Sequence, residues 1–374
     1  MNTALLEKPK RQSAAGVKLE ELSIPGYERV VKATEPKSGL VAIIVLHNTV
    51  LGPALGGTRI LPYRSFEEGL EDALRLAKGM TYKSAVSEMG LGGGKSVIFA
   101  QEKTPELLQA FGRAVHALKG EYICAEDMGC GMEEVRQIRE TTPYVVGLAH
   151  EKSSGDPAPF TAWGVLRGIE SAARRLFGSD SLVGRRVAVQ GVGNVGAKLV
   201  EYLFWAGADV TIADVQEARV AALVKRFGVK VVSPQDILQV SCDVLSPCAG
   251  GAIFNDATIP RLRCRAIAGA ANNQLAEERH AEALRLKTIL YAPDFVINAG
   301  GLLNVAAELE ADGYTSTLPR DQVNRIYERL LSLYDIADRN GESTHAAAVA
   351  LADYRLKYGI GKRLLAPVFH HSVE

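Results

Sequence analysis

The glycine-rich segment at residues 191–196 is the first place where residue types and spacing could do chemistry. Gly191, Gly193 and Gly196 form a G-x-G-x-x-G pattern that follows the apolar run 185–190 and precedes a helix-forming stretch. In this context the first glycine permits a tight turn, the second lets the backbone approach a pyrophosphate, and the third allows close helix–strand packing. The free N–H groups at the start of the helix would face the phosphates. The pattern predicts a dinucleotide site, and a glycine turn without a nucleotide is the alternative.

Asp214 ends the next predicted strand, 18 residues after Gly196. A carboxylate at this position accepts hydrogen bonds from the adenosine ribose hydroxyls. The same negative charge would repel a 2′-phosphate, so the sequence favours NAD over NADP. Arg219, a nearby cation, is the residue that argues for NADP.

Two lysines and one aspartate could form a second chemical group. Lys95 follows three glycines and lies 12 residues after Lys83, and small or apolar residues flank both lysines. Glycines let a ligand or another backbone come close to an ammonium group, and two ammonium groups in one cleft would lower each other's pKa. Lysines are nevertheless usually solvated, and Asp127 alone is typical of a surface acid. The residues by themselves leave both interpretations open.

The elements that must position these groups follow from periodicity. In the first half of the chain, residues 1–20 are polar without periodicity and indicate a disordered extension. Ser65 predicts an N-cap because a glutamate follows three residues later. The expected elements are a strand at 41–49, a turn-rich loop at 51–57, helices at 65–78 and 104–118, and a strand with an exposed loop at 121–129.

The second half alternates strands with helices. A proline-bearing loop leads into a helix within 155–178, and 185–215 is strand, glycine turn, helix and strand. Further strands are expected at 229–232, 242–247, 265–271, 288–293 and 295–301. This alternation predicts an α/β protein with a parallel sheet wound on both faces. Periodicity leaves open which domain holds the helices after residue 321.

The composition excludes several function classes. The chain has 43 basic and 43 acidic residues among 374, so no overall field would attract nucleic acid or an anionic membrane. The five cysteines never form C-x-x-C, which predicts free thiols and no metal site. We find neither a signal-peptide core nor an apolar run of the roughly 18 residues that a membrane helix needs, and we expect a cytoplasmic protein.

Eight motifs together resemble the amino-acid dehydrogenase family, which includes the glutamate, leucine, phenylalanine and valine dehydrogenases. The similarity runs from about Gly26 to the last forty residues. The chain looks most like leucine dehydrogenase, within the leucine, valine, phenylalanine and tryptophan branch. The motifs are GPALGGTR, GMTYK, GLGGGKSVI, AEDMG, GDPAPFTA, GVGNVG, GAANNQL and YAPDFVINAGGLLNVAAE.

The resemblance implies two domains with a cleft between them. An N-terminal α/β catalytic domain would span 21–148, and 344–374 would return to it. A doubly wound Rossmann NAD-binding domain would span 149–343. The family also implies a homo-oligomer, and the sequence leaves open whether it is a dimer or an octamer.

Site residues carry over motif by motif. Lys95 would be the catalytic lysine, Asp127 the carboxylate that transfers protons, and Lys83 the ligand of the substrate carboxylate. The other substrate residues implied are Leu55, Gly56, Gly57, Met80, Ala125, Asn272, Leu302 and Val305. The cofactor residues implied are Thr161, Gly191, Gly193, Asn194, Val195, Gly196, Asp214, Cys248, Ala249, Asn272 and Asn298.

The implied reaction is the NAD-dependent oxidative deamination of an apolar L-amino acid to its 2-keto acid and ammonia, and the reverse. In the glutamate enzymes a lysine that pairs with the substrate's side-chain carboxylate stands where this chain has Leu55. Because an unpaired buried charge is costly, we expect an apolar substrate. The motif AEDMG resembles the leucine and valine enzymes, so we favour a branched aliphatic substrate such as leucine, although TRILPY and GAANNQL resemble the tryptophan enzyme equally. An aromatic substrate, phenylalanine or tryptophan, is the alternative, and a non-catalytic NAD-binding regulatory protein is the alternative of another class. The sequence leaves the physiological direction open.

Overall fold

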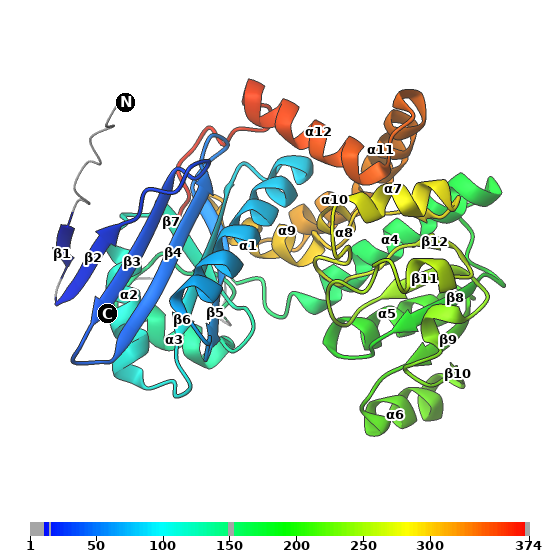
Figure 1. The fold of residues 1–374 in the computed structure, drawn as a ribbon, viewed down its shortest axis with the longest axis horizontal. Coiled ribbons are helices and arrows are strands. Elements are labelled where there is room, and N and C mark those ends of the chain that lie inside the picture. The colour runs from blue at the N-terminus through cyan, green and yellow to red at the C-terminus, as the bar shows by residue number, and fades with distance from the viewer. Residues whose placement is uncertain (1–10, 15, 149–152, 371–374) are drawn as a thin grey trace. The chain divides into compact units, whose positions relative to one another are not determined.

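The structure of the protein is a computed structural model that describes residues 11–14, 16–148 and 153–370. The chain divides into two compact units (Figure 1). The first unit comprises Met1–Gly155, Glu308–Tyr314 and Arg355–Glu374, and the second comprises Asp156–Ala307 and Thr315–Tyr354.

A seven-stranded mixed sheet forms the centre of the first unit, in the order β1-β2-β3-β4-β6-β5-β7. Strands β1 to β4 and β6 pair antiparallel along this order, whereas β5 runs parallel to both β6 and β7. The strands are β1 (Arg11–Ala14), β2 (Val17–Glu21), β3 (Arg29–Glu35), β4 (Leu40–Asn48), β5 (Ala54–Leu61), β6 (Gly92–Phe99) and β7 (Tyr122–Ala125). The loop predicted at 51–57 is wrong for residues 54–57, which form the start of β5. The two adjacent glycines in this stretch make its sequence resemble a loop.

Helices cover both faces of this sheet, which explains why β4 is apolar at successive positions. Ile43 and Val45 belong to the core shared with α1 (Phe66–Ser87). Ile44 and Leu46 belong to the core on the opposite face, shared with α2 (Pro105–His116) and α3 (Met132–Arg139). Figure 1 shows α1 lying along the strands. A strand buried on both faces loses the alternation of apolar and polar residues.

The two helices predicted for this unit are confirmed. Ser65 caps α1 by accepting from the backbone N–H of Glu68, and Thr104 caps α2 in the same way. Helix α1 continues to Ser87, beyond the predicted end at residue 78, and therefore contains Lys83. Small residues on its inner face, Ala73 and Ala77 among them, are buried against the sheet.

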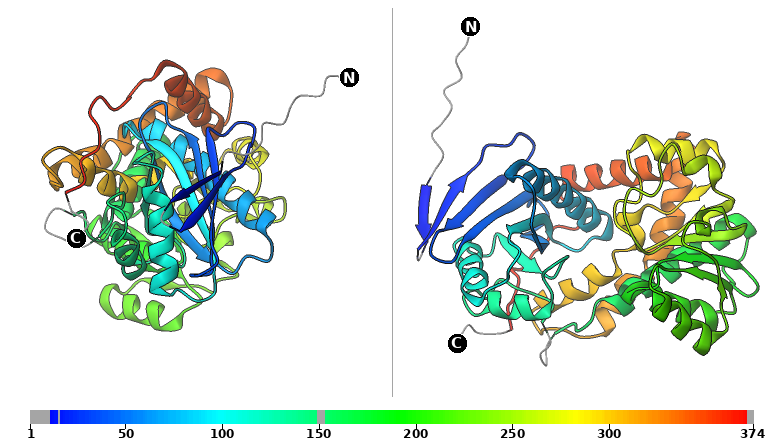
Figure 2. Two further views of the ribbon diagram at one scale, coloured as in Figure 1. Left: turned by 90° about the vertical axis from the view of Figure 1, so that its left-hand side faces the viewer. Right: turned by 60° about the horizontal axis from the view of Figure 1, so that its bottom comes forward.

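The N-terminal prediction was wrong for the described part of residues 1–20. Strand β1 pairs with β2, and β2 pairs with β3, so the chain forms a hairpin at the edge of the sheet. Figure 2 shows this hairpin continuing the sheet. Val17 and Leu19 are buried between exposed or partly exposed neighbours. Two apolar residues at a spacing of two are too short a signal to indicate a strand.

The second unit contains a six-stranded sheet in the order β10-β9-β8-β11-β12-β13, and every neighbouring pair is parallel. This is the strand order of a dinucleotide-binding Rossmann fold. The predicted α/β fold with a doubly wound parallel sheet is therefore confirmed. The strands are β8 (Arg186–Gln190), β9 (Asp209–Ala213), β10 (Lys230–Val231), β11 (Cys242–Pro247), β12 (Cys264–Ile267) and β13 (Leu290–Tyr291).

Helices of the second unit pack on its sheet and on one another; α4, for example, packs against α5, α9 and α11. They are α4 (Ala158–Phe177), α5 (Asn194–Trp205), α6 (Glu217–Phe227), α7 (Arg279–Leu286), α8 (Asp294–Ile297), α9 (Gly300–Ala306), α10 (Thr317–Asn324), α11 (Ile326–Asn340) and α12 (Thr344–Tyr358). Short 3₁₀ turns lie at Ile237–Gln239, Ile259–Arg261 and Ala307–Leu309.

The strand predicted at 295–301 is wrong, because this segment forms α8 and the start of α9. Pro293 precedes α8 as its N-cap residue. Gly300 and Gly301 then pack against Phe160 and Thr161 of α4 with no room for a side chain. A helix buried on all sides gives an unbroken apolar run, which periodicity cannot distinguish from a buried strand.

The boundaries between the units differ from the predicted limits of 21–148, 149–343 and 344–374. The chain leaves the second unit after Tyr354, within α12, and Glu308–Tyr314 belongs to the first unit. Glu308 is buried and accepts hydrogen bonds from the backbone N–H groups of Gly147 and Ser154, at 3.1 and 2.8 Å. These bonds join residues more than 150 positions apart, which is why sequence periodicity missed the segment.

The five cysteines are free, as predicted, and burial raises the pKa of each thiol that lies in a strand, to about 12 for Cys124, Cys242 and Cys264. Over the described ranges, no helix combines the length and the apolar character needed to span a membrane.

Candidate functional site

Glycines let the strands and α1 of the first unit approach very closely around Lys95. A Cβ at Gly56 would lie 1.8 Å from the carbonyl oxygen of Gly94 on the neighbouring strand. A Cβ at Gly93 would lie 2.1 Å from the backbone nitrogen of Thr81 in α1. Protein backbone therefore fills the space beside these glycines, which is one of the two possibilities that the sequence left open.

Lys95 and Asp127 form an ion pair in which the lysine is buried and the aspartate is partly buried. Lys95 lies in β6, opposite Val45 of β4, and only 5% of the residue is exposed. Its Nζ donates to Oδ2 of Asp127 at 2.5 Å. Asp127 follows β7, and its loop is closed by two backbone hydrogen bonds with Cys130, at 3.0 and 2.9 Å. The structure thus brings together the two groups for which the sequence predicted catalysis.

The surroundings shift the pKa values of both groups. Burial lowers the pKa of Lys95 more than the nearby Asp127 carboxylate raises it, and the Arg59 guanidinium lowers it further. Burial would raise the pKa of Asp127, but Lys95 and Arg59 outweigh burial and hold it below its ordinary value. Lys95 therefore gives up its proton more readily than an ordinary lysine, and Asp127 takes one up less readily than an ordinary aspartate. These two shifts suit a lysine that exchanges a proton during the reaction and a neighbouring carboxylate that can relay that proton.

Arg59 is a site residue that the sequence analysis missed. Its Nε donates to Oδ2 of Asp127 at 2.9 Å, and its Nη1 donates to Oδ2 of Asp72 at 2.8 Å. The Tyr63 hydroxyl donates to the same Asp72 oxygen at 2.8 Å. Burial and the Asp72 carboxylate raise the pKa of Tyr63 above its ordinary value. The GPALGGTR motif ends on Arg59, and this was the signal that could have found it.

The other substrate residues predicted for the first unit lie on the same elements. Leu55, Gly56 and Gly57 are buried in β5, directly between β6 and β7. Ala125 ends β7 and is partly buried. Met80 and Lys83 are half-buried on α1.

The glycine turn of the second unit has the backbone that its sequence pattern requires. Gly191 has a φ of 86°, in the left-handed region that favours glycine. A Cβ at Gly196 would lie 2.0 Å from the carbonyl oxygen of Gly191. Asn194 and Val195 begin α5, so the turn leads straight into a helix N-terminus, where free N–H groups can bind an anion.

Cys248 and Ala249 lie beside this turn. They follow β11, which neighbours β8, and the strand order reverses between these two strands. A Cβ at Gly191 would lie 2.3 Å from the Cβ of Ala249, and one at Gly196 would lie 3.3 Å from the Cβ of Cys248. Ligands of open α/β sheets bind at such a reversal point, beyond the carboxyl ends of the strands.

Asp214 lies just beyond β9 and anchors the glycine turn. Its Oδ2 accepts from the backbone N–H of Val192 at 2.7 Å, and its Oδ1 accepts from that of Gln216 at 2.8 Å. Each carboxylate oxygen can accept a further hydrogen bond, so these contacts leave room for hydroxyl donors. The exposed Arg219 lies near Gly193, with Nη1 3.5 Å from the position that a Cβ would take there.

Two asparagines of the second unit are joined. Asn298 follows α8 and is 5% exposed, and its Nδ2 donates to Oδ1 of Asn272 at 2.7 Å and to the Ala270 carbonyl at 3.0 Å. The Oδ1 of Asn298 is buried and has no hydrogen-bond partner in the described part of the chain. A buried acceptor of this kind is costly unless a ligand donor reaches it. It fits an amide N–H donor of a bound molecule.

The remaining predicted residues of the second unit lie on α4 and α9. Thr161 is on α4, and a Cβ at Gly301 would lie 2.5 Å from its Oγ1. Leu302 and Val305 are on α9, one partly buried and the other buried.

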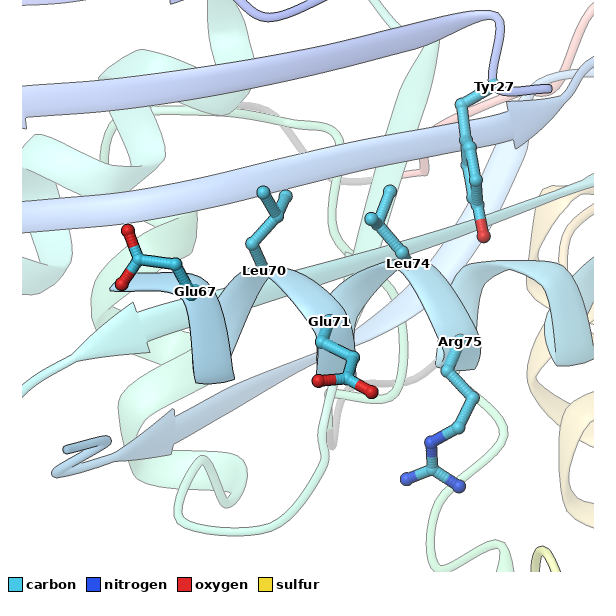
Figure 3. Close-up of a pocket in the computed structure, with 6 residues that line it drawn as sticks. All are labelled: Tyr27, Glu67, Leu70, Glu71, Leu74 and Arg75. Carbon is cyan, nitrogen blue, oxygen red and sulfur yellow. The ribbon is translucent and has the colours of Figure 1, made fainter. Parts of the chain in front are cut away.

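A pocket of about 320 Å³ lies elsewhere in the first unit, on the side of α1 that carries Leu70 and Leu74 (Figure 3). Neither Lys95 nor Asp127 lines it, and its polar groups are two carboxylates, one guanidinium and one phenol. We therefore place no catalysis there. Its lining residues are Tyr27, Glu67, Leu70, Glu71, Leu74 and Arg75.

One group of potential metal ligands occurs within the described residues: Asp256, Glu277 and His280. Arg279 occupies it, because its guanidinium donates to both oxygens of Asp256, at 2.8 and 2.6 Å, and to Glu277 at 2.9 Å. The group is an ion-pair cluster on the surface of the second unit.

Comparisons with known proteins match residues of both units. Residues 27–144 match the family model of the Glu/Leu/Phe/Val dehydrogenase dimerisation domain, and residues 211–352 match that of the glutamate/leucine/phenylalanine/valine dehydrogenases. The chain is 48% identical to a leucine dehydrogenase of Geobacillus stearothermophilus over 335 residues, which cover 88% of this chain and 91% of the relative. It is 43% identical to a phenylalanine dehydrogenase of Caldalkalibacillus thermarum, over 89% of this chain and 92% of the relative.

A solved structure extends the likeness to three dimensions. The crystal structure of L-tryptophan dehydrogenase from Nostoc punctiforme has a TM-score of 0.79 and 43% identity, and the match covers 89% of this chain and 97% of that one. The resemblance inferred from the eight motifs is confirmed. The chain belongs to the glutamate/leucine/phenylalanine/valine dehydrogenase family of oxidoreductases.

Proposed function

We propose that this protein catalyses the NAD-dependent oxidative deamination of a branched aliphatic L-amino acid, leucine foremost, to the 2-keto acid and ammonia, and the reverse reaction. One observation supports this most: the contact of the buried Lys95, through Nζ, with Asp127 Oδ2, at 2.5 Å, in a member of an amino-acid dehydrogenase family.

NAD is the proposed cofactor, bound by the second unit. The turn at Gly191–Gly196 would hold the pyrophosphate, and Asp214 would accept from the ribose hydroxyls. The buried Oδ1 of Asn298, which has no partner in the described part of the chain, would accept from the nicotinamide carboxamide. Thr161, Cys248 and Ala249 would complete the contacts. Bound NAD would supply the acceptor for the hydride that leaves Cα of the substrate.

Lys83 would bind the substrate carboxylate through its ammonium group. Lys95, with its pKa lowered by burial, would act as the neutral amine that assists water in attacking the iminium carbon. Asp127 would move protons between the substrate nitrogen and oxygen as the carbinolamine collapses to keto acid and ammonia. The 2.5 Å contact would let a proton pass directly between the Lys95 amine and the Asp127 carboxylate.

The substrate preference rests on Leu55. This residue is 1% exposed in β5, and an apolar side chain there offers no partner to a substrate carboxylate. Met80, Ala125, Leu302 and Val305 are apolar as well. We propose leucine as the substrate ahead of the aromatic amino acids because of sequence identity. The leucine dehydrogenase relatives are 46–48% identical to this chain, whereas the phenylalanine and tryptophan enzymes are 43–44% identical.

We further propose that the protein self-associates through its first unit. The family model that matches residues 27–144 is described as a dimerisation domain.

The test is a substrate panel. The purified protein is incubated with NAD and leucine, valine, isoleucine, phenylalanine, tryptophan or glutamate, and the reduced cofactor is followed by absorbance. We expect the highest kcat/KM with a branched aliphatic substrate. The highest kcat/KM with phenylalanine or tryptophan would contradict only the proposed size of the substrate's side chain. No reduction with any amino acid would overturn the proposal and favour a regulatory NAD-binding protein.

A further inference from the structure

Asp127 makes both of its side-chain contacts through one oxygen. Lys95 Nζ and Arg59 Nε both donate to Oδ2, at 2.5 and 2.9 Å. Oδ1 has no hydrogen-bond partner in the described part of the chain, and 24% of the Asp127 side chain is exposed. The two oxygens of this carboxylate are therefore not equivalent: Lys95 and Arg59 hold Oδ2, whereas Oδ1 is available to a bound molecule.

Arg59 is itself held rigidly. Its Nη1 donates to Oδ2 of Asp72 on α1 at 2.8 Å, and only 15% of the Arg59 side chain is exposed. Asp72 is held in turn by the Tyr63 hydroxyl, at 2.8 Å. The mostly exposed Arg75 also donates to Asp72, from Nη2 to Oδ1 at 3.0 Å, but an ion pair this exposed contributes little to holding Asp72 in place. A planar guanidinium that bonds two carboxylates through different nitrogens has one orientation, which a lysine ammonium cannot reproduce.

We propose that Arg59 is a positioning residue of the reaction: it clamps Oδ2 of Asp127 against Lys95, so that Oδ1 is the oxygen that exchanges protons with the substrate. Arg59 acts through Asp127 and touches no reacting atom. We call Arg59 together with its two carboxylate partners, Asp127 and Asp72, the clamp. Asp72 attaches the clamp to α1, the helix that also carries Lys83. This inference rests on the proposed amino-acid dehydrogenase function.

Electrostatics adds a measurable consequence. The charged groups around the clamp are Lys95 on β6, Asp72 and Arg75 on α1, and Asp127 after β7, with Tyr63 beside Asp72. Arg59 lowers the pKa of Lys95 and that of Asp127 alike. Removing the charge of Arg59 therefore raises the pKa of Lys95 and the pKa of Asp127. The acid limb of the pH–rate profile then moves to higher pH, whether this limb reflects the titration of Lys95 or of Asp127.

The experiment compares Arg59→Met, Arg59→Lys and Arg75→Gln with the wild type. Arg75 is the matched control, because it also donates to Asp72 but has no contact with Asp127 in the described structure, and 54% of its side chain is exposed. We expect Arg59→Met to lower kcat by about 100-fold, as for lost acid–base catalysis, with a smaller change in KM. Its acid limb moves to higher pH. Arg59→Lys keeps the charge and the position of that limb but recovers only part of kcat, and Arg75→Gln matches the wild type.

Amide hydrogen exchange of the loop 126–130 gives a readout that needs no activity. Loss of the clamp frees Asp127, so the two amides bonded between Asp127 and Cys130 exchange faster in Arg59→Met and not in Arg75→Gln. If Arg59→Met fails to fold, Arg59→Lys tests the proposal through the amide exchange of the same loop and through its kcat. An Arg59→Met enzyme within threefold of wild type with an unmoved acid limb, or an equal loss in Arg75→Gln, overturns the proposal. A wild type that deaminates nothing refutes the function instead, while the exchange data still report the clamp.

Discussion

Gly57 lies in contact with the loop that carries Asp127. A Cβ at residue 57 would be 2.8 Å from the Cβ of Asp127 and 2.5 Å from the carbonyl oxygen of Glu126. A real Cβ essentially never comes within 3.0 Å of another non-bonded heavy atom, so any side chain at residue 57 must displace the loop. The glycine is therefore a geometric condition for the Lys95–Asp127 pair, because β5 must pass within touching distance of residues 126 and 127.

Gly57→Ala is expected to lower kcat by about 100-fold, because a misplacement near 1 Å has that effect on positioned catalytic groups. It also destabilises the fold by about 1–3 kcal/mol, as for overpacking. Gly79→Ala is the matched control: it lies within α1 and its Cβ would meet nothing within 4 Å. That variant keeps wild-type activity and is slightly more stable. Steady-state kinetics and thermal unfolding measure both, and an active Gly57→Ala enzyme would contradict the close contact.

Removing either member of the ion pair is expected to lower kcat strongly. We expect Lys95→Ala to bind NAD and to fold while losing at least 1,000-fold in kcat, on the order of the upper range for acid–base catalysis. Asp127→Asn loses roughly 100- to 10,000-fold, because the amide cannot carry the proton. Single-turnover kinetics measure the loss, and circular dichroism checks the fold. Turnover of Lys95→Ala within tenfold of wild type would remove Lys95 from its catalytic role.

The buried lysine also predicts how stability depends on pH. Because the pKa of Lys95 is lowered in the fold, the unfolded chain holds a proton that the folded protein lacks between that lowered pKa and the ordinary value of 10.5. The free energy of unfolding then rises with pH across this window. Lys95→Met removes this rise, which urea unfolding at pH 7, 8, 9 and 10 can measure. Parallel stability curves for Lys95→Met and the wild type would show that Lys95 keeps its ordinary pKa.

Local motifs were predictable from the sequence and long-range contacts were not. The turn at Gly191–Gly196 is encoded within one strand–turn–helix unit, so its pattern is complete in a short stretch. Arg59 and Asp127 are separated by 68 positions, and nothing in periodicity indicates that they meet. The strand predicted at 295–301 failed for a related reason: the burial of α8 and α9 against α4 depends on residues far away in the chain.

Asp214 is expected to set the choice of cofactor. Asp214→Ser removes the charge that repels a 2′-phosphate, so the preference for NAD over NADP in kcat/KM narrows by at least about tenfold, close to 1.4 kcal/mol. Asp209→Ser, at the start of β9, removes an equal charge from the far end of the same strand and leaves the preference unchanged. Initial rates with both cofactors measure the ratio. A wild type that uses NADP as well as NAD would contradict the role of Asp214 and direct attention to the exposed Arg219.

Leu55 is expected to exclude acidic substrates, and Leu55→Lys tests this directly. The residue is 1% exposed and pairs with Gly93 and Ile123 on the strands at either side, so a lysine there would place its ammonium in an apolar surround. A substrate side-chain carboxylate would then be the partner that this ammonium lacks. We expect the ratio of kcat/KM for glutamate to that for leucine to rise on the order of 100-fold, within the range that a single polar contact can discriminate. Leu55→Met conserves volume and should retain the preference for leucine. If Leu55→Lys remains folded by thermal unfolding and its ratio equals that of Leu55→Met, residue 55 does not contact the substrate side chain, and the substrate class must be decided elsewhere in the site.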